Sequence, residues 1–154
     1  MIKIEDKIKK LGIVIPQITK TVAEYIPAVI VGNIIFTSGV ISKVDGMKTF
    51  TGKVGKELTL EDGKEAARQS AINLLAILKY ELGDLDRVER IVRLVGFVNS
   101  APGFKGQPFV INGASELFVE IWGDKGRHAR AALSTNELFN DEPVEVYLTA
   151  QIKE

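Results

Sequence analysis

Two charged residues near the C-terminus are the first candidates for chemistry. Arg130 has alanine on both sides, an apolar setting for a side chain that keeps its charge and so needs an anionic partner. That partner is either a protein carboxylate in a structural ion pair or a substrate carboxylate, which a guanidinium grips with two parallel hydrogen bonds. Glu145 lies fifteen residues further along, on the polar face of a predicted strand. It is simply solvent-exposed unless a pocket surrounds it.

Three other polar positions have both a functional and a structural explanation. Asn112 and Gly113 are poor helix formers in the middle of a predicted helix, which indicates either a site or a close contact between helices. Tyr25 precedes the first predicted strand, where it is either a site residue or an aromatic at the edge of the core with a hydrated hydroxyl. His128 shares strand parity with Arg130, but a lone histidine is more often a packing or surface residue than a catalyst.

Several kinds of chemistry are excluded. The chain of 154 residues has no cysteine, so it has no thiolate nucleophile, disulfide or cysteine-bound metal. No serine stands in a Gly-x-Ser-x-Gly elbow, and the glycine-rich stretch 52–57 lacks the phosphate-loop spacing. With one histidine and no EF-hand pattern, we expect neither a metal nor an organic cofactor.

Charge and hydropathy limit the partners. Twenty basic residues balance twenty acidic ones, whereas nucleic-acid binding normally requires a basic excess. The longest nearly apolar stretch, 26–36, is far shorter than the ~20 residues that span a bilayer. The N-terminus has no apolar core typical of a signal peptide. We therefore expect a cytoplasmic protein without a membrane segment.

Patterning predicts the elements that must position these residues. A short helix is expected over 4–12, a hairpin from 28–31 and 34–37, and a third short strand or a loop at 47–51. Thr59 begins the strongest helix with a capping box, and Gly83 ends it.

The second half of the chain continues with a continuous apolar stretch, which predicts an interior strand over 90–98. A helix over 108–122 and strands over 129–135 and 144–152 follow. This order predicts an α+β two-layer sandwich with a largely antiparallel mixed sheet. We expect one domain, 1–154, with a helical extension over about residues 1–20.

Six stretches together resemble the RidA/YjgF family of enamine/imine deaminases, in particular its longer chorismate-mutase-like, endoribonuclease-like subgroup. They are 25–29, 32–39, 65–73, 110–117, 126–130 and 144–146. The resemblance implies that Arg130 grips the substrate carboxylate and that Glu145 positions a water molecule. It also implies that the substrate pocket is lined by Tyr25, Ser38, Gly39, Asn112 and Ala132.

The implied activity is that of a 2-iminobutanoate/2-iminopropanoate deaminase, a hydrolase that converts 2-imino or 2-enamino acids to 2-keto acids and ammonia. The resemblance also implies a homotrimer with sites between subunits. That arrangement would remove a geometric difficulty, because a hairpin turning near Phe139 pairs Glu145 with about Ser134. Arg130 would then lie about 13 Å away along the strand.

This sequence departs from the family pattern in residues expected to touch the pocket walls. Val40 and Ser42 replace Gln and Pro, Ala132 stands where the family often has Cys, and Leu138 is followed by Phe139 instead of Pro. Two alternatives therefore stay open. One is a non-catalytic binder of small carboxylates. The other is an endoribonuclease or RNA-binding protein that uses the basic cluster at 125–130, although no aromatic stacking platform accompanies that cluster.

Overall fold

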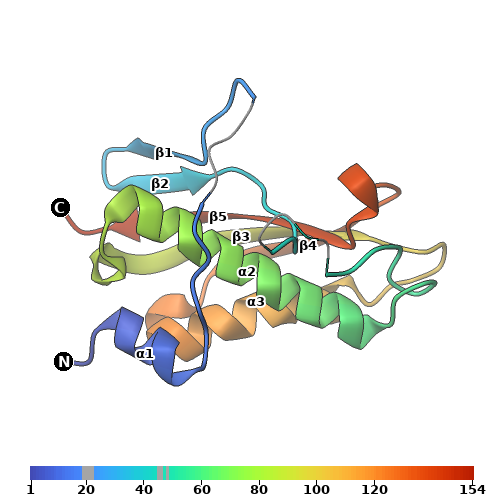
Figure 1. Cartoon of the computed structure of the whole chain (residues 1–154), viewed down its shortest axis with the longest axis horizontal. Helices are drawn as coiled ribbons and strands as arrows, with labels where there is room; N and C mark the ends of the chain where they lie inside the picture. The colour runs from blue at the N-terminus through green and yellow to red at the C-terminus, as the bar shows by residue number, and fades with distance from the viewer. Residues whose placement is uncertain (19–22, 45–46, 48) are drawn as a thin grey trace.

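A mixed β-sheet organises the chain (Figure 1). Over the residues that the computed structural model describes, 1–18, 23–44, 47 and 49–154, the sheet has five strands in the order β1-β2-β5-β3-β4. The strands are β1 (Ala28–Val31), β2 (Ile34–Thr37), β3 (Val88–Asn99), β4 (Ala129–Thr135) and β5 (Val144–Ile152). The helices are α1 (Ile4–Lys10), α2 (Leu60–Leu82) and α3 (Gln107–Trp122), with 3-10 turns η1 (Leu85–Arg87), η2 (Gly123–Gly126) and η3 (Phe139–Asp141). Both long helices lie on one face of the sheet, which confirms the predicted α+β sandwich.

Local signals place several elements as predicted. β1 and β2 pair antiparallel around the turn at 32–33, which confirms the hairpin. The hydroxyl of Thr59 accepts a hydrogen bond from the backbone N–H of Asp62, and the Asp62 carboxylate accepts one from the N–H of Thr59. This capping box satisfies two donors that the first turn of α2 would otherwise leave unpaired. Gly83 is the C-cap of the same helix.

The two C-terminal strands do not form the predicted hairpin. β3 lies between them and pairs in parallel with β4 and antiparallel with β5. Pairing of Glu145 with Ser134 across a turn near Phe139 is therefore wrong. The reason is that β3 is an interior strand, as its continuous apolar sequence predicts, and its backbone needs hydrogen-bond partners on both edges. β4 and β5 supply one edge each.

The connection between β2 and α2 contains no regular strand among its described residues. The predicted strand or loop at 47–51 lies partly outside them, at residue 48, and Met47 makes only an isolated bridge to Val44. One position in this connection is anchored in the interior. Ser42 is fully buried, and its hydroxyl donates to the carboxylate of Glu142 at 2.9 Å. Ser42 therefore supports the connection from inside and does not line an open pocket wall, contrary to the expectation.

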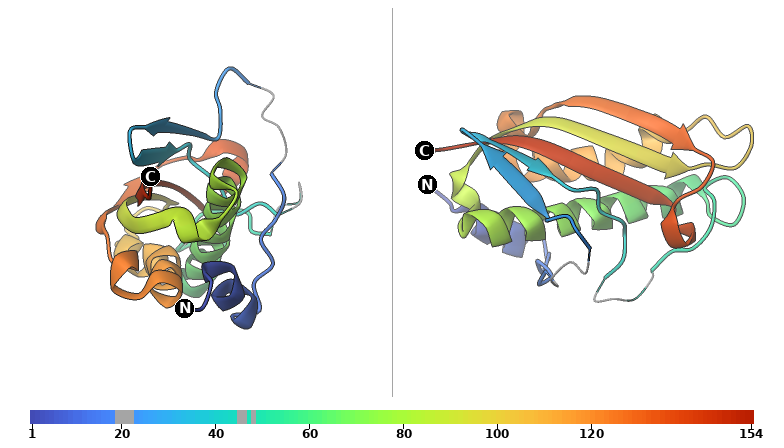
Figure 2. Two further views of the ribbon diagram at one scale, coloured as in Figure 1. Left: turned by 90° about the vertical axis from the view of Figure 1, so that its left-hand side faces the viewer. Right: turned by 90° about the horizontal axis from the view of Figure 1, so that it is seen from above.

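The two faces of the sheet differ in what covers them. The helix-facing side of β3 and β5 is fully buried, and its core residues include Ile91, Leu94, Val98, Val146, Leu148 and Ala150. The right-hand view of Figure 2 shows the opposite side of the sheet, which no described helix covers. Large apolar side chains are nevertheless exposed on this outer face, among them Val29, Phe36, Leu133 and Tyr147.

Close packing of α2 against α3 depends on Gly113. A Cβ atom at this position would lie 2.0 Å from the carbonyl oxygen of Lys64 in α2. The structure thus confirms close helix packing as the reason for this glycine. Among the described helices, including these two, none is long and apolar enough to cross a bilayer.

We expect Gly113→Ala to lower the free energy of unfolding by about 2 kcal/mol, because overpacking against backbone outweighs the ~1 kcal/mol gain in helix propensity. Urea unfolding measures this difference. Glu116→Ala is the control, because it changes an exposed position of the same helix without adding an atom between the helices. Its effect should stay within about 0.5 kcal/mol, since an exposed ion pair contributes little. A Gly113→Ala protein as stable as wild type would contradict the packing argument.

Candidate functional site

Arg130 lies on the edge strand β4 and faces the helix side of the sheet. It pairs with Leu94, which is fully buried on that side. The guanidinium reaches α3, where its Nη1 donates to Asn112 Oδ1 at 2.7 Å and to Ser115 Oγ at 3.2 Å. Arg130 is exposed, so the expectation of a poorly hydrated arginine among alanines is wrong. The alanines precede and follow it along an edge strand and do not enclose it.

Neutral groups hold this guanidinium. Asn112 and Ser115 are three residues apart, so they lie on the same face of α3, and both are half-buried. Within the described part of the chain, Arg130 forms no salt bridge, and its Nε and Nη2 have no hydrogen-bond partner. The protein thus fixes the group through one nitrogen and leaves a pair of parallel donors available for an external carboxylate.

His128 extends this cluster through Ser115. Its Nε2 lies 2.9 Å from Ser115 Oγ, and its Nδ1 lies 2.6 Å from the carbonyl oxygen of Gly126. The ring also packs edge-on against Phe118, with ring centroids 6.1 Å apart and an interplanar angle of 84°. Ser115 is not among the predicted site residues, although its position about one turn after Asn112 is a usable signal.

Burial lowers the pKa of His128 below its usual range. The positive charge of Arg130 lowers this pKa further, whereas the hydrogen bond to the Gly126 carbonyl opposes both effects. The imidazole is therefore neutral at pH 7. A carbonyl can only accept, so Nδ1 carries the proton and Nε2 accepts from the Ser115 hydroxyl.

Glu145 lies in a second cluster with Gly39. The segment after β2 runs beside β5, where Val40 and Val146 exchange backbone hydrogen bonds of 2.8 and 2.9 Å. This pairing brings the backbone of Gly39 against the side chain of Glu145, so that a Cβ at residue 39 would lie 3.1 Å from Glu145 Cδ. A glycine here leaves the carboxylate room that any other residue would reduce. Glu145 is half-buried.

The remaining predicted residues divide between these clusters. Next to Gly39, Ser38 donates its hydroxyl to the carbonyl oxygen of Ile26 at 2.7 Å, which ties it to the residue after Tyr25. Tyr25 itself is 57% exposed. Ala132 belongs with Arg130, since it lies two residues further on the same face of β4 and packs against the core.

The two clusters lie on opposite faces of the sheet. Arg130 is level with Leu94 of β3, whereas Glu145 is level with Phe97, three residues along. Because side chains alternate between faces, an odd offset places Arg130 and Glu145 on different sides. They are also separated by about 10 Å along the strands and about 10 Å across them. One copy of the chain therefore cannot present both groups to one small molecule.

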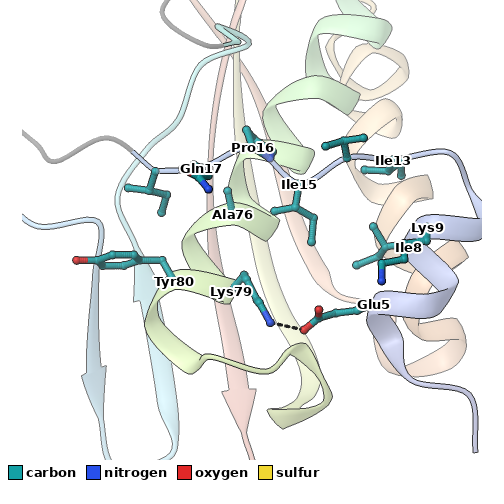
Figure 3. Close-up of a pocket in the computed structure, with 12 residues that line it drawn as sticks. Glu5, Ile8, Lys9, Ile13, Ile15, Pro16, Gln17, Ala76, Lys79 and Tyr80 are labelled. Carbon is teal, nitrogen blue, oxygen red and sulfur yellow. Dashed lines mark hydrogen bonds and ion pairs between the residues drawn. The ribbon is translucent and has the colours of Figure 1, made fainter.

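A cavity of about 590 Å³ lies elsewhere in the molecule (Figure 3). The segment 13–18 and α1 form one wall, and α2 forms the other with Ala76 and Tyr80. The Lys79 ammonium and the Glu5 carboxylate pair across it at 2.6 Å. The lining is mainly apolar and includes none of the predicted site residues. The cavity marks where the N-terminal extension packs on α2.

Comparison with known proteins covers nearly the whole chain. A family model described as "YjgF/chorismate_mutase-like, putative endoribonuclease" matches residues 5–152. Protein TCP17 of Trypanosoma cruzi is 38% identical over 145 residues, which are 94% of this chain and 91% of that protein. The crystal structure of Atu1372 from Agrobacterium tumefaciens is 38% identical with a TM-score of 0.90, covering 97% of this chain and 92% of that one. A "putative endoribonuclease" from Shewanella oneidensis MR-1 is 30% identical with a TM-score of 0.94, covering 98% and 100%.

We expect NMR titration of the single imidazole to give a pKa for His128 below the ordinary value near 6.5. Arg130→Gln should raise this pKa relative to wild type, because the removed positive charge disfavours imidazolium. Arg127→Gln removes an exposed charge from the residue before His128, which does not contribute to the lowered pKa, and should leave that pKa unchanged. Equal shifts in both variants would contradict the proximity of Arg130 to the ring.

The same titration has a consequence for stability. The folded protein binds the His128 proton less readily than the unfolded chain, so folding loses stability as the pH falls from the ordinary histidine value toward the lowered one. Below the lowered pKa both states are protonated, and this contribution no longer changes with pH.

Proposed function

Because the chain belongs to the YjgF/chorismate-mutase-like family, we propose that it hydrolyses reactive 2-imino or 2-enamino acids to 2-keto acids and ammonia. The family match confirms the resemblance that the motifs predicted. The observation that carries the proposal is the state of Arg130. Its guanidinium is held by Asn112 and Ser115, both neutral, and within the described residues no carboxylate neutralises it. A planar pair of donors in this state fits a small organic acid.

The proposed reaction needs few groups. The substrate carboxylate docks on Arg130, which places the electrophilic imine carbon beside a water molecule oriented by Glu145. The water oxygen bonds to carbon as the C=N electron pair moves to nitrogen, and Glu145 takes a proton from the water. Return of that proton to nitrogen gives a carbinolamine. Transfer of its hydroxyl proton to nitrogen then breaks the C–N bond as the C–O bond becomes C=O, which releases ammonia and the 2-keto acid. Because imines hydrolyse in water unaided, positioning and modest proton transfer suffice.

We further propose that the site is shared between copies of the chain in a homotrimer. Arg130 and Glu145 lie on opposite faces of one sheet, so a working pair has to come from two subunits. The outer face supports this assembly, because side chains such as Phe36 and Leu133 are about half exposed there and contiguous exposed apolar surface favours association. Glu145 lies on this outer face, where a neighbouring copy would carry its Arg130 edge strand to it.

RNA cleavage is the activity named in the description of the Shewanella oneidensis protein. The basic cluster at 125–130 offers weaker support for it than the sequence suggested. Lys125 pairs with Glu89 at 2.6 Å, and Arg127 contacts Asp124 at 3.4 Å. These pairs reduce the positive potential that would attract phosphates. A fall in RNA affinity with salt that corresponds to several released counterions would favour the RNA function over deamination.

Replacement of Arg130 by lysine tests the carboxylate clamp. Lysine keeps the charge but removes the planar pair of donors, so we expect kcat/KM to fall about thirtyfold, equivalent to roughly 2 kcal/mol. Ammonia release is measured with a dehydratase that generates the imine in the same cuvette. Arg127→Lys is the matched control and should behave as wild type. Near-normal activity of Arg130→Lys would exclude the clamp.

A second measurement separates the enzyme from a non-catalytic binder. Glu145→Gln should retain binding of pyruvate, the 2-keto acid product of 2-iminopropanoate, while ammonia release falls at least tenfold, because an amide cannot take the proton from water. If wild type binds pyruvate and releases no ammonia above the spontaneous rate, the chain is a binder of small carboxylates instead.

Mixing the two impaired variants tests the shared site. In randomly mixed trimers of Arg130→Lys and Glu145→Gln, about a quarter of the sites combine an intact arginine with an intact glutamate from different subunits. We expect about a quarter of wild-type activity after the mixture is unfolded and refolded together. If the mixture were only as active as the same amounts of the two variants refolded separately, Arg130 and Glu145 of each site would have to come from one chain.

A further inference from the structure

We propose that His128 is a positioning residue that orients the donors of Arg130 through the hydroxyl of Ser115. The inference rests on the proposed function in one respect, namely that the ligand of Arg130 is a carboxylate. The chain of contacts runs from the Gly126 carbonyl through both nitrogens of the imidazole to Ser115 Oγ, and from there to Arg130 Nη1. Of the residues in this series of contacts, only Arg130 needs to touch the substrate.

The direction of each hydrogen bond follows from the two groups at the ends of this series, the Gly126 carbonyl and Arg130 Nη1. The Gly126 carbonyl can only accept, so His128 Nδ1 donates to it. In the neutral ring Nε2 then has a lone pair for the Ser115 proton. With its proton committed to the ring, Ser115 presents an oxygen lone pair to Arg130 Nη1 at 3.2 Å. Burial favours the neutral ring that this order of bonds requires.

The histidine is itself well fixed, so it can serve as a reference point. The edge-on contact with Phe118 sets the position of the ring. The carbonyl of Gly126 that receives its Nδ1 proton belongs to a turn packed tightly on α3, where a Cβ at Gly126 would lie 2.1 Å from the Phe118 carbonyl oxygen. The exposed guanidinium, in contrast, has no enclosing wall. Asn112 and Ser115 each accept one hydrogen bond from the guanidinium, and both bonds are needed to fix the orientation of its plane.

If the acceptor on residue 128 is lost, the Ser115 hydroxyl can turn its proton toward Arg130 or solvent. Arg130 would then keep Asn112 as its one firm anchor and rotate about that contact. The two parallel donors would match a carboxylate in only a fraction of orientations. The cost would appear in substrate binding and not in the chemical step, since Glu145 and its water are unaffected.

Two isosteric substitutions isolate the acceptor. In His128→Gln the side-chain oxygen can occupy the position of Nε2 and still accept from Ser115. In His128→Asn the amide reaches only as far as Nδ1, so it can still donate to Gly126 but cannot accept from Ser115. We expect His128→Asn to raise both the Kd for pyruvate and the KM about fivefold to tenfold, the size of one lost hydrogen bond, with kcat unchanged. His128→Gln should restore both values to within about twofold of wild type.

A double-mutant cycle with Ser115→Ala tests whether the effect passes through the hydroxyl. In the Ser115→Ala background the two His128 variants should bind pyruvate equally, because the connection is already broken. Equal affinity of the two variants in the Ser115 background would overturn the proposal. The proposal would also be overturned if His128→Asn lowered the affinity for pyruvate by the same factor in the Ser115→Ala background as in wild type. If the histidine were merely structural, both substitutions would lower the melting temperature, and His128→Gln and His128→Asn would bind pyruvate with the same affinity.

A ligand-free measurement separates this inference from the proposed function. ¹⁵N relaxation of the Arg130 Nε–H group should show increased motion in His128→Asn but not in His128→Gln, whatever the substrate is. If wild type neither binds pyruvate nor releases ammonia while this difference in motion is present, the proposed function fails and the positioning role stands. If wild type binds pyruvate and the motion of Arg130 is equal in both variants, the positioning role fails and the carboxylate clamp stands.

Discussion

The placement of β3 between β4 and β5 is the constraint on which the candidate site depends. It separates the two strands that carry Arg130 and Glu145, and the odd offset along β3 places their side chains on opposite faces. The separation is not adjustable, because β3 is hydrogen-bonded along both edges and a shift of one residue would move its buried apolar side chains into solvent. Each chain therefore has two separate clusters of candidate site residues, one between β4 and α3 and the other between β5 and the segment after β2.

Each of these two clusters depends on a close backbone approach that glycine permits. Gly113 lets α3 pack closely on α2, and the same helix carries Asn112 and Ser115 to the edge strand, where they receive Arg130. On the other face, Gly39 leaves room for the Glu145 carboxylate. The functional groups are thus held by side chains and backbone that belong to the packed interior, although Arg130 itself is exposed. That combination gives a guanidinium held through Nη1, with Nε and Nη2 open among the described residues, which suits reversible binding of a small anion.

Local signals in the sequence were sufficient for most of the fold. The capping box at Thr59, the turn at 32–33 and the apolar run of β3 each determine their element through interactions within a few residues. The order of the strands, in contrast, is not determined locally, because it depends on which strands pair with the backbone groups on the two edges of β3. Nothing near 136–143 reveals that β4 and β5 do not pair with each other. The same limit applies to the site. Arg130 and Asn112 could be selected by residue type and spacing, whereas the contacts of Ser115 with His128 and Arg130 form only once α3 lies against β4.

Exposure of Arg130 also bears on how such a site could work. A guanidinium with only neutral partners attracts any small anion in water, but an exposed charge pair is worth little, about 1 kcal/mol or less. Burial by a neighbouring subunit would change this balance, because removal of water strengthens the attraction to a carboxylate while Asn112 and Ser115 keep the fork oriented. On the proposed shared site, assembly therefore contributes more than the missing glutamate. It would turn a weak surface contact of Arg130 into an enclosed one, and the same contact would cover apolar side chains of the neighbouring copy's outer face, the face that carries Glu145.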